Sequence, residues 1–356
     1  MNHWLKLACI ASLGVAAQGA DAYNYQTDTC GTLNFNSGNM TFNYANNLST
    51  AEKVDIGTAF ARLTAFSDAT ITTNDNGDNS FSTGNSQNEI YHNINVGTAD
   101  CWVNYNTSSC NVNEADIRFG DEPWVTGSSS GHLPYDGSAA TGGRSILGTA
   151  VHEGGHCVGM AHENTVYNMM GEEWSHVTRN GVTSYYGPGE DLSDGLIDLH
   201  GKRSGTDTYR DVGATVMRYE FADGAYSDHQ FGVMRDSGGA VLPVIGSFEG
   251  QDIFQVVAGR SVQLELTFEN NGEKNTESAN TGYYLSTNSV ISTADTQLQT
   301  GNISLGRGAP YETTVTVTIP VATAPGNYYL GVYVDYDDLI PEITNANNVG
   351  YYPVSI

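Results

Sequence analysis

The residues best suited to chemistry are three histidines and one glutamate within a stretch of eleven residues. His152 and His156 are four residues apart, so on a helix they lie on one face and can reach the same metal ion. Glu153, beside them, is badly placed as a ligand but well placed to take a proton from a metal-bound water. We therefore predict a helix that carries two metal ligands and a general base.

His162 completes this set only if the helix ends before it. On a continued helix it would lie about 15 Å from His152, too far to share a zinc ion at a bond length of about 2.0–2.1 Å. Gly159 allows the chain to turn, because glycine enters the left-handed conformation that ends helices without a steric penalty. Three protein ligands leave a fourth position for water, so the segment predicts one catalytic zinc ion.

The spacing from His152 to His162 matches the extended signature of the metzincin zinc peptidases, and this part of the chain resembles that clan. The resemblance implies a methionine-containing turn shortly after the third histidine. Residues 167–171, with the sequence YNMMG, lie at a suitable distance. Met170 fits the matrixin-like branch, and Met169 is the alternative.

One departure from the wider clan concerns a tyrosine. In the astacin and serralysin branches a tyrosine two residues after the turn methionine reaches the metal, whereas Gly171 or Glu172 holds that place here. Tyr167, Tyr185 and Tyr186 are the nearby candidates to replace it. The part that a tyrosine plays in the site is therefore left open.

The function implied by the resemblance is that of a zinc-dependent metalloendopeptidase. A zinc-bound water, activated by Glu153, would hydrolyse peptide bonds, and the partner would be a protein or peptide substrate. The alternative is an adhesion or binding protein with a catalytically idle metzincin-like domain. Glu153 favours the enzyme, because a domain kept only for binding needs no base.

The first 22 residues predict a cleavable signal peptide and therefore a secreted, extracellular protein. Lys6 supplies a positive start, residues 7–17 are apolar, and residues 20–22 have the small-x-small form of a cleavage site. The apolar run is too short to span a membrane as a mature helix, and no other stretch approaches that length. We expect no membrane insertion.

The charge and the cysteine content limit the classes of partner and the cellular compartment that fit this sequence. The formal net charge of -26, from 40 acidic and 14 basic residues, argues against nucleic acid as a partner. Cys30, Cys101, Cys110 and Cys157 form an even set that suits an oxidising compartment and permits three pairings. Cys101 and Cys110 are neighbours across a polar turn, so we expect them to pair. That leaves Cys30 and Cys157 paired or free.

Residues 23–203 are predicted to form one domain that positions the histidines. Ser49 and Glu52 form a capping box for an amphipathic helix over 49–66, and Ser145 is placed to cap the histidine-bearing helix. The resemblance implies an α/β metzincin-like catalytic domain with a twisted sheet, an active-site helix and a closing helix. The expected closing helix is 190–201, and the expected strands are 41–44, 69–73, 89–92, 101–105, 115–119 and the cleft edge 131–135.

Other polar groups are less specific. The polar loop 74–88 offers oxygens that calcium prefers, but it lacks a full calcium-loop pattern, so Ca²⁺ and a solvated loop stay open as alternatives. Asp335, Asp337 and Asp338 also offer calcium ligands, although a solvated hairpin is the favoured interpretation. His176 and His200 are superfluous as zinc ligands and are predicted to have surface or substrate-contact roles.

The C-terminal part predicts an all-β sandwich. Apolar and polar residues alternate in 262–268, 315–319 and 328–334, with turn residues between them. Residues 251–356 resemble the CARDB family, a cell-adhesion-related domain of bacteria, which implies contact with a cell surface or matrix. Residues 204–250 are interpreted as a β-rich connecting segment.

Overall fold

Strands dominate the computed structural model, which describes residues 23–127, 143–171, 177–181 and 183–356. Of the described residues 46% lie in strands and 13% in helices, so the chain is mostly β and contains a β-sandwich-like fold. The predicted α/β metzincin-like core, with its twisted sheet, active-site helix and closing helix, is therefore wrong as a fold class. The prediction rested on the resemblance around the histidines, whereas most strands of the described residues pair outside the sheet that packs near the helices. The predicted signal peptide and the edge 131–135 lie outside the described residues.

The N-terminal region contains a five-stranded sheet in the order β4-β3-β5-β7-β6. The pairs β3–β4, β3–β5 and β5–β7 are parallel, and β6 joins the edge antiparallel to β7. The predicted strands fall within these elements, apart from small shifts at their ends. Their bounds are β3 Asn39–Ala45, β4 Thr70–Asp78, β5 Glu89–His92, β6 Ala99–Tyr105 and β7 Val112–Phe119.

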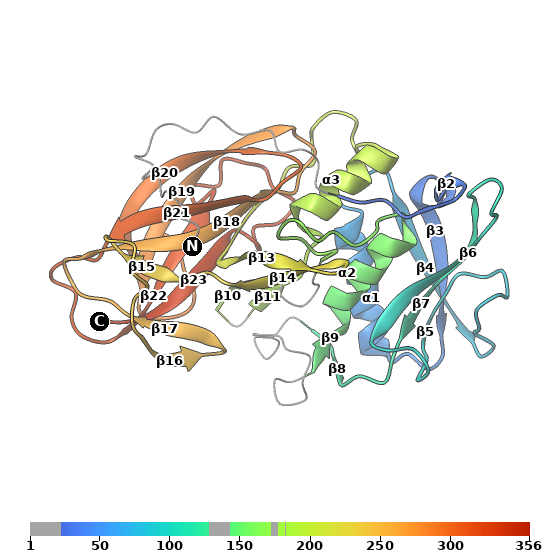
Figure 1. Cartoon of the computed structure of the whole chain (residues 1–356), viewed down its shortest axis with the longest axis horizontal. Helices are drawn as coiled ribbons and strands as arrows, with labels where there is room; N and C mark the ends of the chain where they lie inside the picture. Colours follow the sequence, from blue (N-terminus) through green and yellow to red (C-terminus); the bar gives the residue numbers. More distant parts are fainter. Residues whose placement is uncertain (1–22, 128–142, 172–176, 182) are drawn as a thin grey trace, which may run out of the picture.

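Three α-helices in the described residues lie between this sheet and the sandwich (Figure 1). They are α1 Thr50–Leu63, α2 Ile146–Cys157 and α3 Gly189–His200. The predicted capping box is confirmed: Ser49 Oγ accepts from the Glu52 N–H, and Glu52 accepts from the Ser49 N–H at 2.7 Å. Ser145 Oγ likewise caps α2 by accepting from the Gly148 N–H at 3.2 Å. Local capping chemistry therefore sets where the first two helices begin.

Short elements connect these parts. They are the 3₁₀ turn Asn36–Gly38 and three two-stranded ribbons: β1 Thr27–Asp28 with β2 Gly31–Thr32, β8 Trp124–Val125 with β9 Arg144–Ser145, and β10 Thr178–Asn180 with β11 Thr183–Tyr185. Among the described residues no helix is long and apolar enough to cross a membrane.

The C-terminal region packs two sheets around an apolar core. One sheet has the order β12-β18-β15, with β21 also paired to β18, and the other has the order β16-β17-β23-β22-β19-β20. The core includes Leu264, Phe268 and Val332, which alternate with polar residues as predicted. The bounds are β12 Val212–Thr215, β15 Met234–Asp236, β16 Val244–Phe248, β17 Gln251–Gln255, β18 Ser261–Asn270, β19 Thr276–Ser286, β20 Thr296–Gly306, β21 Tyr311–Thr318, β22 Asn327–Val334 and β23 Val349–Ser355.

A hairpin of β13 Met217–Asp223 and β14 Tyr226–Phe231 leaves the sandwich and points toward α2 (Figure 1). The strands on either side of it, β12 and β15, both pair with β18. Much of the segment interpreted as a connection is thus part of the sandwich, and the hairpin is the piece that projects from it.

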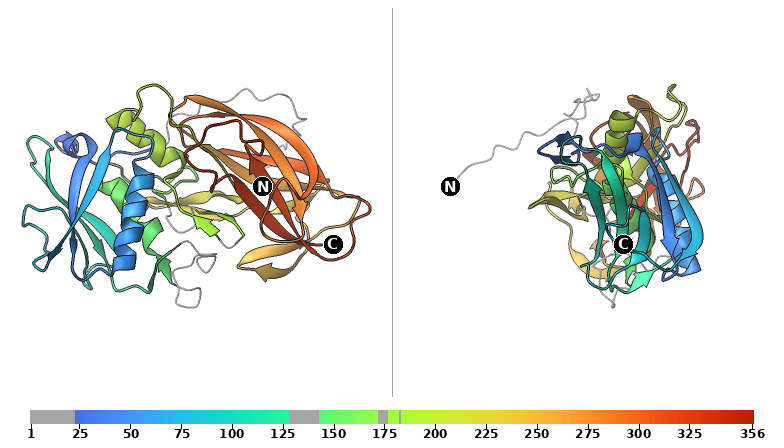
Figure 2. Two further views of the ribbon diagram at one scale, coloured as in Figure 1. Left: turned by 180° about the vertical axis from the view of Figure 1, so that it is seen from behind. Right: turned by 90° about the vertical axis from the view of Figure 1, so that its right-hand side faces the viewer.

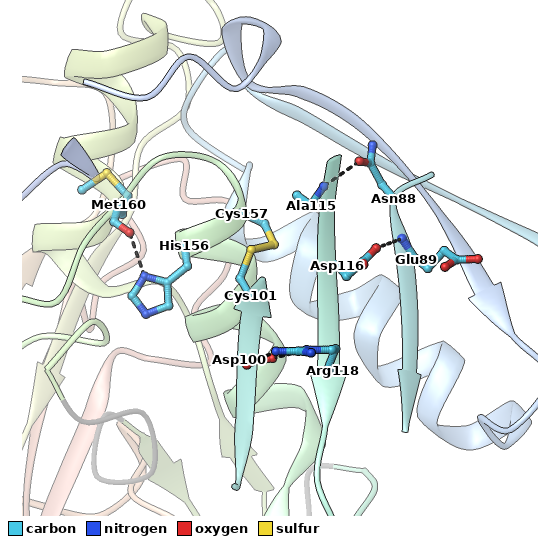
Figure 3. Close-up of a disulfide and its surroundings, with 10 residues drawn as sticks. All are labelled: Asn88, Glu89, Asp100, Cys101, Ala115, Asp116, Arg118, His156, Cys157 and Met160. Carbon is cyan, nitrogen blue, oxygen red and sulfur yellow. Dashed lines mark hydrogen bonds and ion pairs between the residues drawn. A yellow bond between two sulfur atoms is a disulfide. The ribbon is translucent and has the colours of Figure 1, made fainter. Parts of the chain in front are cut away.

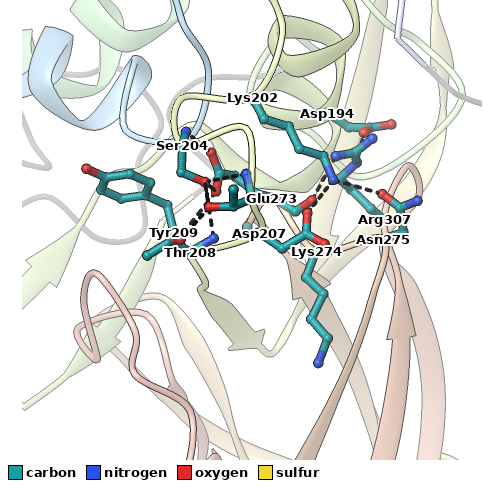
Figure 4. A network of polar contacts seen from close by, with 12 residues as sticks. Asp194, Lys202, Ser204, Asp207, Thr208, Tyr209, Glu273, Lys274, Asn275 and Arg307 are labelled. Atoms are coloured by element: carbon teal, nitrogen blue, oxygen red, sulfur yellow. Dashed lines mark hydrogen bonds and ion pairs between the residues drawn. The ribbon is translucent and has the colours of Figure 1, made fainter.

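The two regions are joined by polar contacts of buried groups, and they lie end to end (Figure 2). The buried carboxylate of Glu190, in the first turn of α3, accepts from the N–H groups of Asn270 at 2.8 Å and Ala309 at 3.0 Å. Figure 4 shows a second group of contacts, in which Arg307 pairs with Asp194 and Glu273 accepts from the Ser204 N–H. Helix α3 is therefore held to the sandwich by charged and backbone groups.

The disulfides differ from the predicted pairing. Cys30 is bonded to Cys110 and Cys101 to Cys157, so the predicted Cys101–Cys110 bond is wrong. The reason is the register of β6 and β7, which places Cys101 opposite Ile117 and leaves Cys110 at the far end, in the turn. Two disulfides are compatible with an extracellular location.

Candidate metal centre

The three predicted ligands come together at the end of α2. His152 and His156 project from one face of the helix with ring centroids 4.8 Å apart. The helix ends at Cys157, and Gly159 takes a φ of +111°, a backbone conformation that favours glycine. The chain then returns so that the His162 ring lies 4.6 Å from the ring of His156.

Two ring orientations are fixed by backbone carbonyls. His152 Nδ1 donates to the Met169 carbonyl at 2.8 Å, and His156 Nδ1 donates to the Met160 carbonyl at 2.7 Å (Figure 3 shows the second bond). A carbonyl oxygen can only accept, so in each neutral ring the proton is on Nδ1 and the lone pair is on Nε2. Both histidines therefore present their Nε2 atoms as ligands.

This donor set fits zinc. One ligand nitrogen from each of His152, His156 and His162 lies within 4.8 Å of the others, and the Nε2 atoms of the last two are 3.0 Å apart. Ligands on a tetrahedral zinc ion with bonds of about 2.0–2.1 Å are about 3.3 Å apart. Across the described ranges, no other group of three or more His, Cys, Asp and Glu side chains converges in this way. Three imidazoles are also donors that zinc prefers.

Burial keeps the histidines in the form that binds metal. Desolvation, together with the neighbouring His162, lowers the pKa of His152 to about 3. Desolvation likewise lowers the pKa of His156 well below its usual value, with smaller contributions from the other two histidines. Neutral imidazole is the ligand form, so these ligands need lose no proton at neutral pH.

The two candidate methionines have different positions. Met169 supplies the carbonyl that orients His152, whereas the side chain of Met170 lies directly under α2. A Cβ at Gly155 would lie 2.7 Å from the Met170 sulfur, and a Cβ at Gly154 would lie 2.8 Å from the Leu63 side chain. The paired glycines thus let Met170 and α1 approach the histidine-bearing helix closely.

The second disulfide also supports the centre (Figure 3). Cys157 follows His156 directly, and its bond to Cys101 ties the end of α2 to strand β6. Next to Cys101 in this strand, Asp100 forms a two-point ion pair with Arg118 of β7, at 2.8 and 2.5 Å. The helix end and the sheet edge are therefore linked covalently beside His156, one of the three candidate ligands.

The three histidines and Glu153 line one open cleft of about 580 Å³. Glu153 is buried, with 6% of its surface exposed, but it still borders this space. Strand β6 contributes one side of the cleft, and the β13–β14 hairpin contributes Asp223, Tyr226, Ser227 and Asp228. A larger open groove of about 830 Å³ runs along α1, but none of the histidines lines it.

Tyr226 is the site residue that the sequence analysis missed. Its ring centroid lies 4.1 Å from that of His162. The tyrosines considered as candidates lie elsewhere: Tyr167 is buried against His229, and Tyr185 packs against Arg62. The alternating residues and the turn between them could have predicted the β13–β14 hairpin. Nothing in the sequence near His152, His156 and His162 indicates that this hairpin lies next to these histidines.

The remaining histidines and the polar loop have structural contacts. His200 Nε2 donates to the Val158 carbonyl at 2.7 Å, so it fixes the end of α2. His176 lies outside the described residues. In the loop 74–88 the N–H groups of three consecutive residues, from Gly84 to Ser86, point to the buried Glu114 carboxylate. The Glu114 carboxylate is therefore stabilised by these hydrogen bonds. Calcium binding by the loop stays a prediction.

Comparison with known families identifies a domain in the C-terminal part of the chain. Residues 249–351 match the CARDB family, so the predicted CARDB domain is confirmed. No curated protein matches the chain. None of the comparisons shows a metzincin or matrixin catalytic domain, and that resemblance stays a prediction.

Solved structures similar to part of the chain include a CARDB domain from Pyrococcus furiosus in complex with di-metal ions. It is 16% identical, and the match covers 41% of this chain and 88% of that one, with a TM-score of 0.25. A β-glucosidase from Listeria innocua is 15% identical over 38% of this chain and 17% of its own, with a TM-score of 0.20. A family 123 glycoside hydrolase from Clostridium perfringens is 11% identical over 29% and 22%, with a TM-score of 0.18.

Proposed function

We propose that the chain is a zinc-dependent endopeptidase in which His152, His156 and His162 hold the metal and Glu153 is the general base. The observation that carries the proposal is the convergence of three histidine nitrogens within 4.8 Å, in a cleft that Glu153 also lines. The spacing of these residues, which resembles the metzincin signature, adds to it.

Each residue has a defined task in this reaction. When bound, zinc would polarise the scissile carbonyl and lower the pKa of the attacking water. His152 and His156 keep their Nε2 atoms toward the centre through their bonds to backbone carbonyls. Glu153 takes the proton of the attacking water and passes it to the leaving amine. The cleft is open, which suits a protein or peptide substrate.

Secretion and surface contact belong to the same proposal. The two disulfides and the predicted signal peptide suit an extracellular enzyme. The CARDB domain suits a role in holding the enzyme near a cell surface or matrix. It also favours the rival interpretation, an adhesion or binding protein with an idle site, and the experiment must separate the two.

The test is the Glu153→Gln variant, which keeps the shape of the side chain and removes its basicity. We expect zinc to stay at one ion per chain, measured by metal analysis, while kcat/KM on an unfolded protein substrate falls about 100-fold to 10,000-fold. Asp252→Asn, at an exposed acid on β17, is the control and should keep full activity. Equal cleavage by both variants would refute the role of Glu153, and an inactive parent chain would support the adhesion protein.

A further inference from the structure

The β13–β14 hairpin is anchored at its base by the sandwich. The Gly232 N–H donates to the Val216 carbonyl at 2.7 Å and closes the hairpin where it leaves the sheet. Thr267 Oγ1 of β18 donates to the Met217 carbonyl at 2.7 Å. Arg218 pairs with Glu265 and Glu312, both at 2.9 Å. The hairpin therefore starts from a defined position rather than from a loose linker.

The far end of the hairpin is attached to the segment that follows the third histidine. Asn164 Nδ2 donates to the Gly224 carbonyl at 2.6 Å, and Asn168 Nδ2 donates to Ser227 Oγ at 3.3 Å. Ser227 Oγ also contacts His229 Nε2 at 2.7 Å. Asn168, Ser227 and His229 are buried, whereas the Asn164–Gly224 bond at the tip of the hairpin is exposed.

Gly171 shows how closely the two segments approach. A Cβ at this position would lie 1.7 Å from Ser227 Oγ and 2.8 Å from the Glu163 carbonyl. At residue 171 no side chain fits between the hairpin and the 163–171 segment, which also supplies the Met169 carbonyl that orients His152. The segment 163–171, on which the hairpin packs, therefore also helps to orient the histidines.

Tyr226 connects this framework to the cleft. One part of its ring packs on His162, with centroids 4.1 Å apart and planes at 39°. The side chain is nevertheless 47% exposed and lines the cleft with Asp223 and Asp228. A single aromatic ring therefore contacts a metal-binding residue and borders the space for substrate.

We propose that the β13–β14 hairpin is a built-in wall of the catalytic cleft and that Tyr226 is a positioning residue. It holds the His162 ring in its metal-binding orientation, and it limits where a bound peptide can lie. This inference rests on the proposed zinc peptidase function. It also gives the C-terminal region a part in the reaction in addition to any role in adhesion.

The experiment compares Tyr226→Ala with Tyr226→Phe in the full chain. Zinc affinity is measured by competition with a chromogenic chelator, and KM and kcat are measured separately on one peptide substrate. Tyr226→Ala should weaken zinc binding by about tenfold or more and raise KM. Tyr226→Phe keeps the ring and should restore both. The control is Phe221→Ala, because Phe221 lies on the same hairpin and is 48% exposed but does not line the cleft.

The outcomes separate this inference from the proposed function. If Tyr226→Ala binds zinc and cleaves peptide as the parent does, the positioning role is refuted and the peptidase stands. If Phe221→Ala has the same effect as Tyr226→Ala, the hairpin is needed only for stability, and the specific role of Tyr226 is refuted. If the parent neither binds zinc nor cleaves peptide, both proposals are refuted together.

Discussion

The region that bears the histidines and the sandwich are held together in different ways. Residues 23–203 contain all four cysteines of the two disulfides, and their strands in the described residues reach nine residues at most. No cysteine occurs after Cys157, and the sandwich strands reach eleven residues around an apolar core. Both regions pair strands and bury an apolar core, and the first adds two covalent links, one of which ties the histidine-bearing helix to strand β6.

This difference follows from what each region positions. A metal site needs a few side chains held within fractions of an ångström, and cross-links beside them supply that restraint. The Cys101–Cys157 bond, which adjoins His156, is such a link. A sandwich needs only its sheets to face each other, which alternating residues such as Leu264 and Leu266 achieve by burial. Among the described residues that line the cleft, those from the C-terminal region all lie on the β13–β14 hairpin.

The largest expected effect that would test this contrast comes from removing one cross-link. Replacing Cys101 and Cys157 together by serine should lower the free energy of unfolding by about 2–4 kcal/mol, measured by denaturant titration. It should also weaken zinc binding, because the end of α2 is no longer tied to β6. The matched control is the double serine variant at Cys30 and Cys110, which should lose similar stability and keep its zinc affinity. Equal loss of zinc in both would show that the link matters only for overall stability.

A smaller effect is expected at two helical glycines, with opposite signs. Gly155→Ala should lower the free energy of unfolding by about 1 kcal/mol, because the steric cost against buried Met170 exceeds the gain in helix propensity. Gly57→Ala should raise it by about 0.5–1 kcal/mol, because its Cβ would meet only Tyr44 Oη, at 3.6 Å. Thermal or denaturant unfolding measures both. A gain at both positions would mean that the site helix packs as loosely as an ordinary one.

The smallest expected effect is a pH dependence that the two regions share. Burial, followed by the nearby Glu114 and Glu89, raises the pKa of Asp116 to about 8, and burial beside Asp211 raises the pKa of Glu342 in the sandwich to about 9. A carboxyl with a raised folded-state pKa stabilises the fold below its unfolded pKa, and this contribution is lost as pH rises toward the folded value.

Stability should therefore fall between about pH 4 and pH 8, and Asp116→Asn should flatten this slope by less than about 1 kcal/mol per pH unit. Melting temperature against pH, with Glu342→Gln as the sandwich counterpart, measures it. An unchanged slope in Asp116→Asn would refute the contribution of Asp116 to the pH dependence.

Local signals in the sequence predicted much of the first region. The Ser49 and Ser145 caps and the histidine spacing each involve residues within about three turns of helix, where geometry follows directly from separation along the chain. The turn at Gly159 was predictable for the same reason, since the later histidine cannot otherwise return. The sandwich strands were predictable from their alternation.

Features that depend on pairing between distant segments were predicted poorly. The expected Cys101–Cys110 bond failed because strand register separates the two residues. The expected α/β class failed because most of the described strands belong to the two sandwich sheets and to two-stranded ribbons, which the residues around the histidines do not indicate. Tyr226 was missed because its approach to His162 depends on how the hairpin leaves the sandwich. Strand register, strand pairing and the position of the hairpin all depend on segments that are far apart in the sequence, so no short stretch of residues predicts them.

The crossing order of the disulfides has a consequence for a chain exposed to proteolysis. The loop closed by Cys30 and Cys110 overlaps the loop closed by Cys101 and Cys157, so together they cover the chain from residue 30 to residue 157 without a gap. A single backbone cut anywhere between these limits leaves both fragments covalently joined. If the chain cleaves other proteins, copies of the chain itself are among the proteins that it meets. A nicked molecule of this kind would keep His152 and His156 attached to the rest of the site.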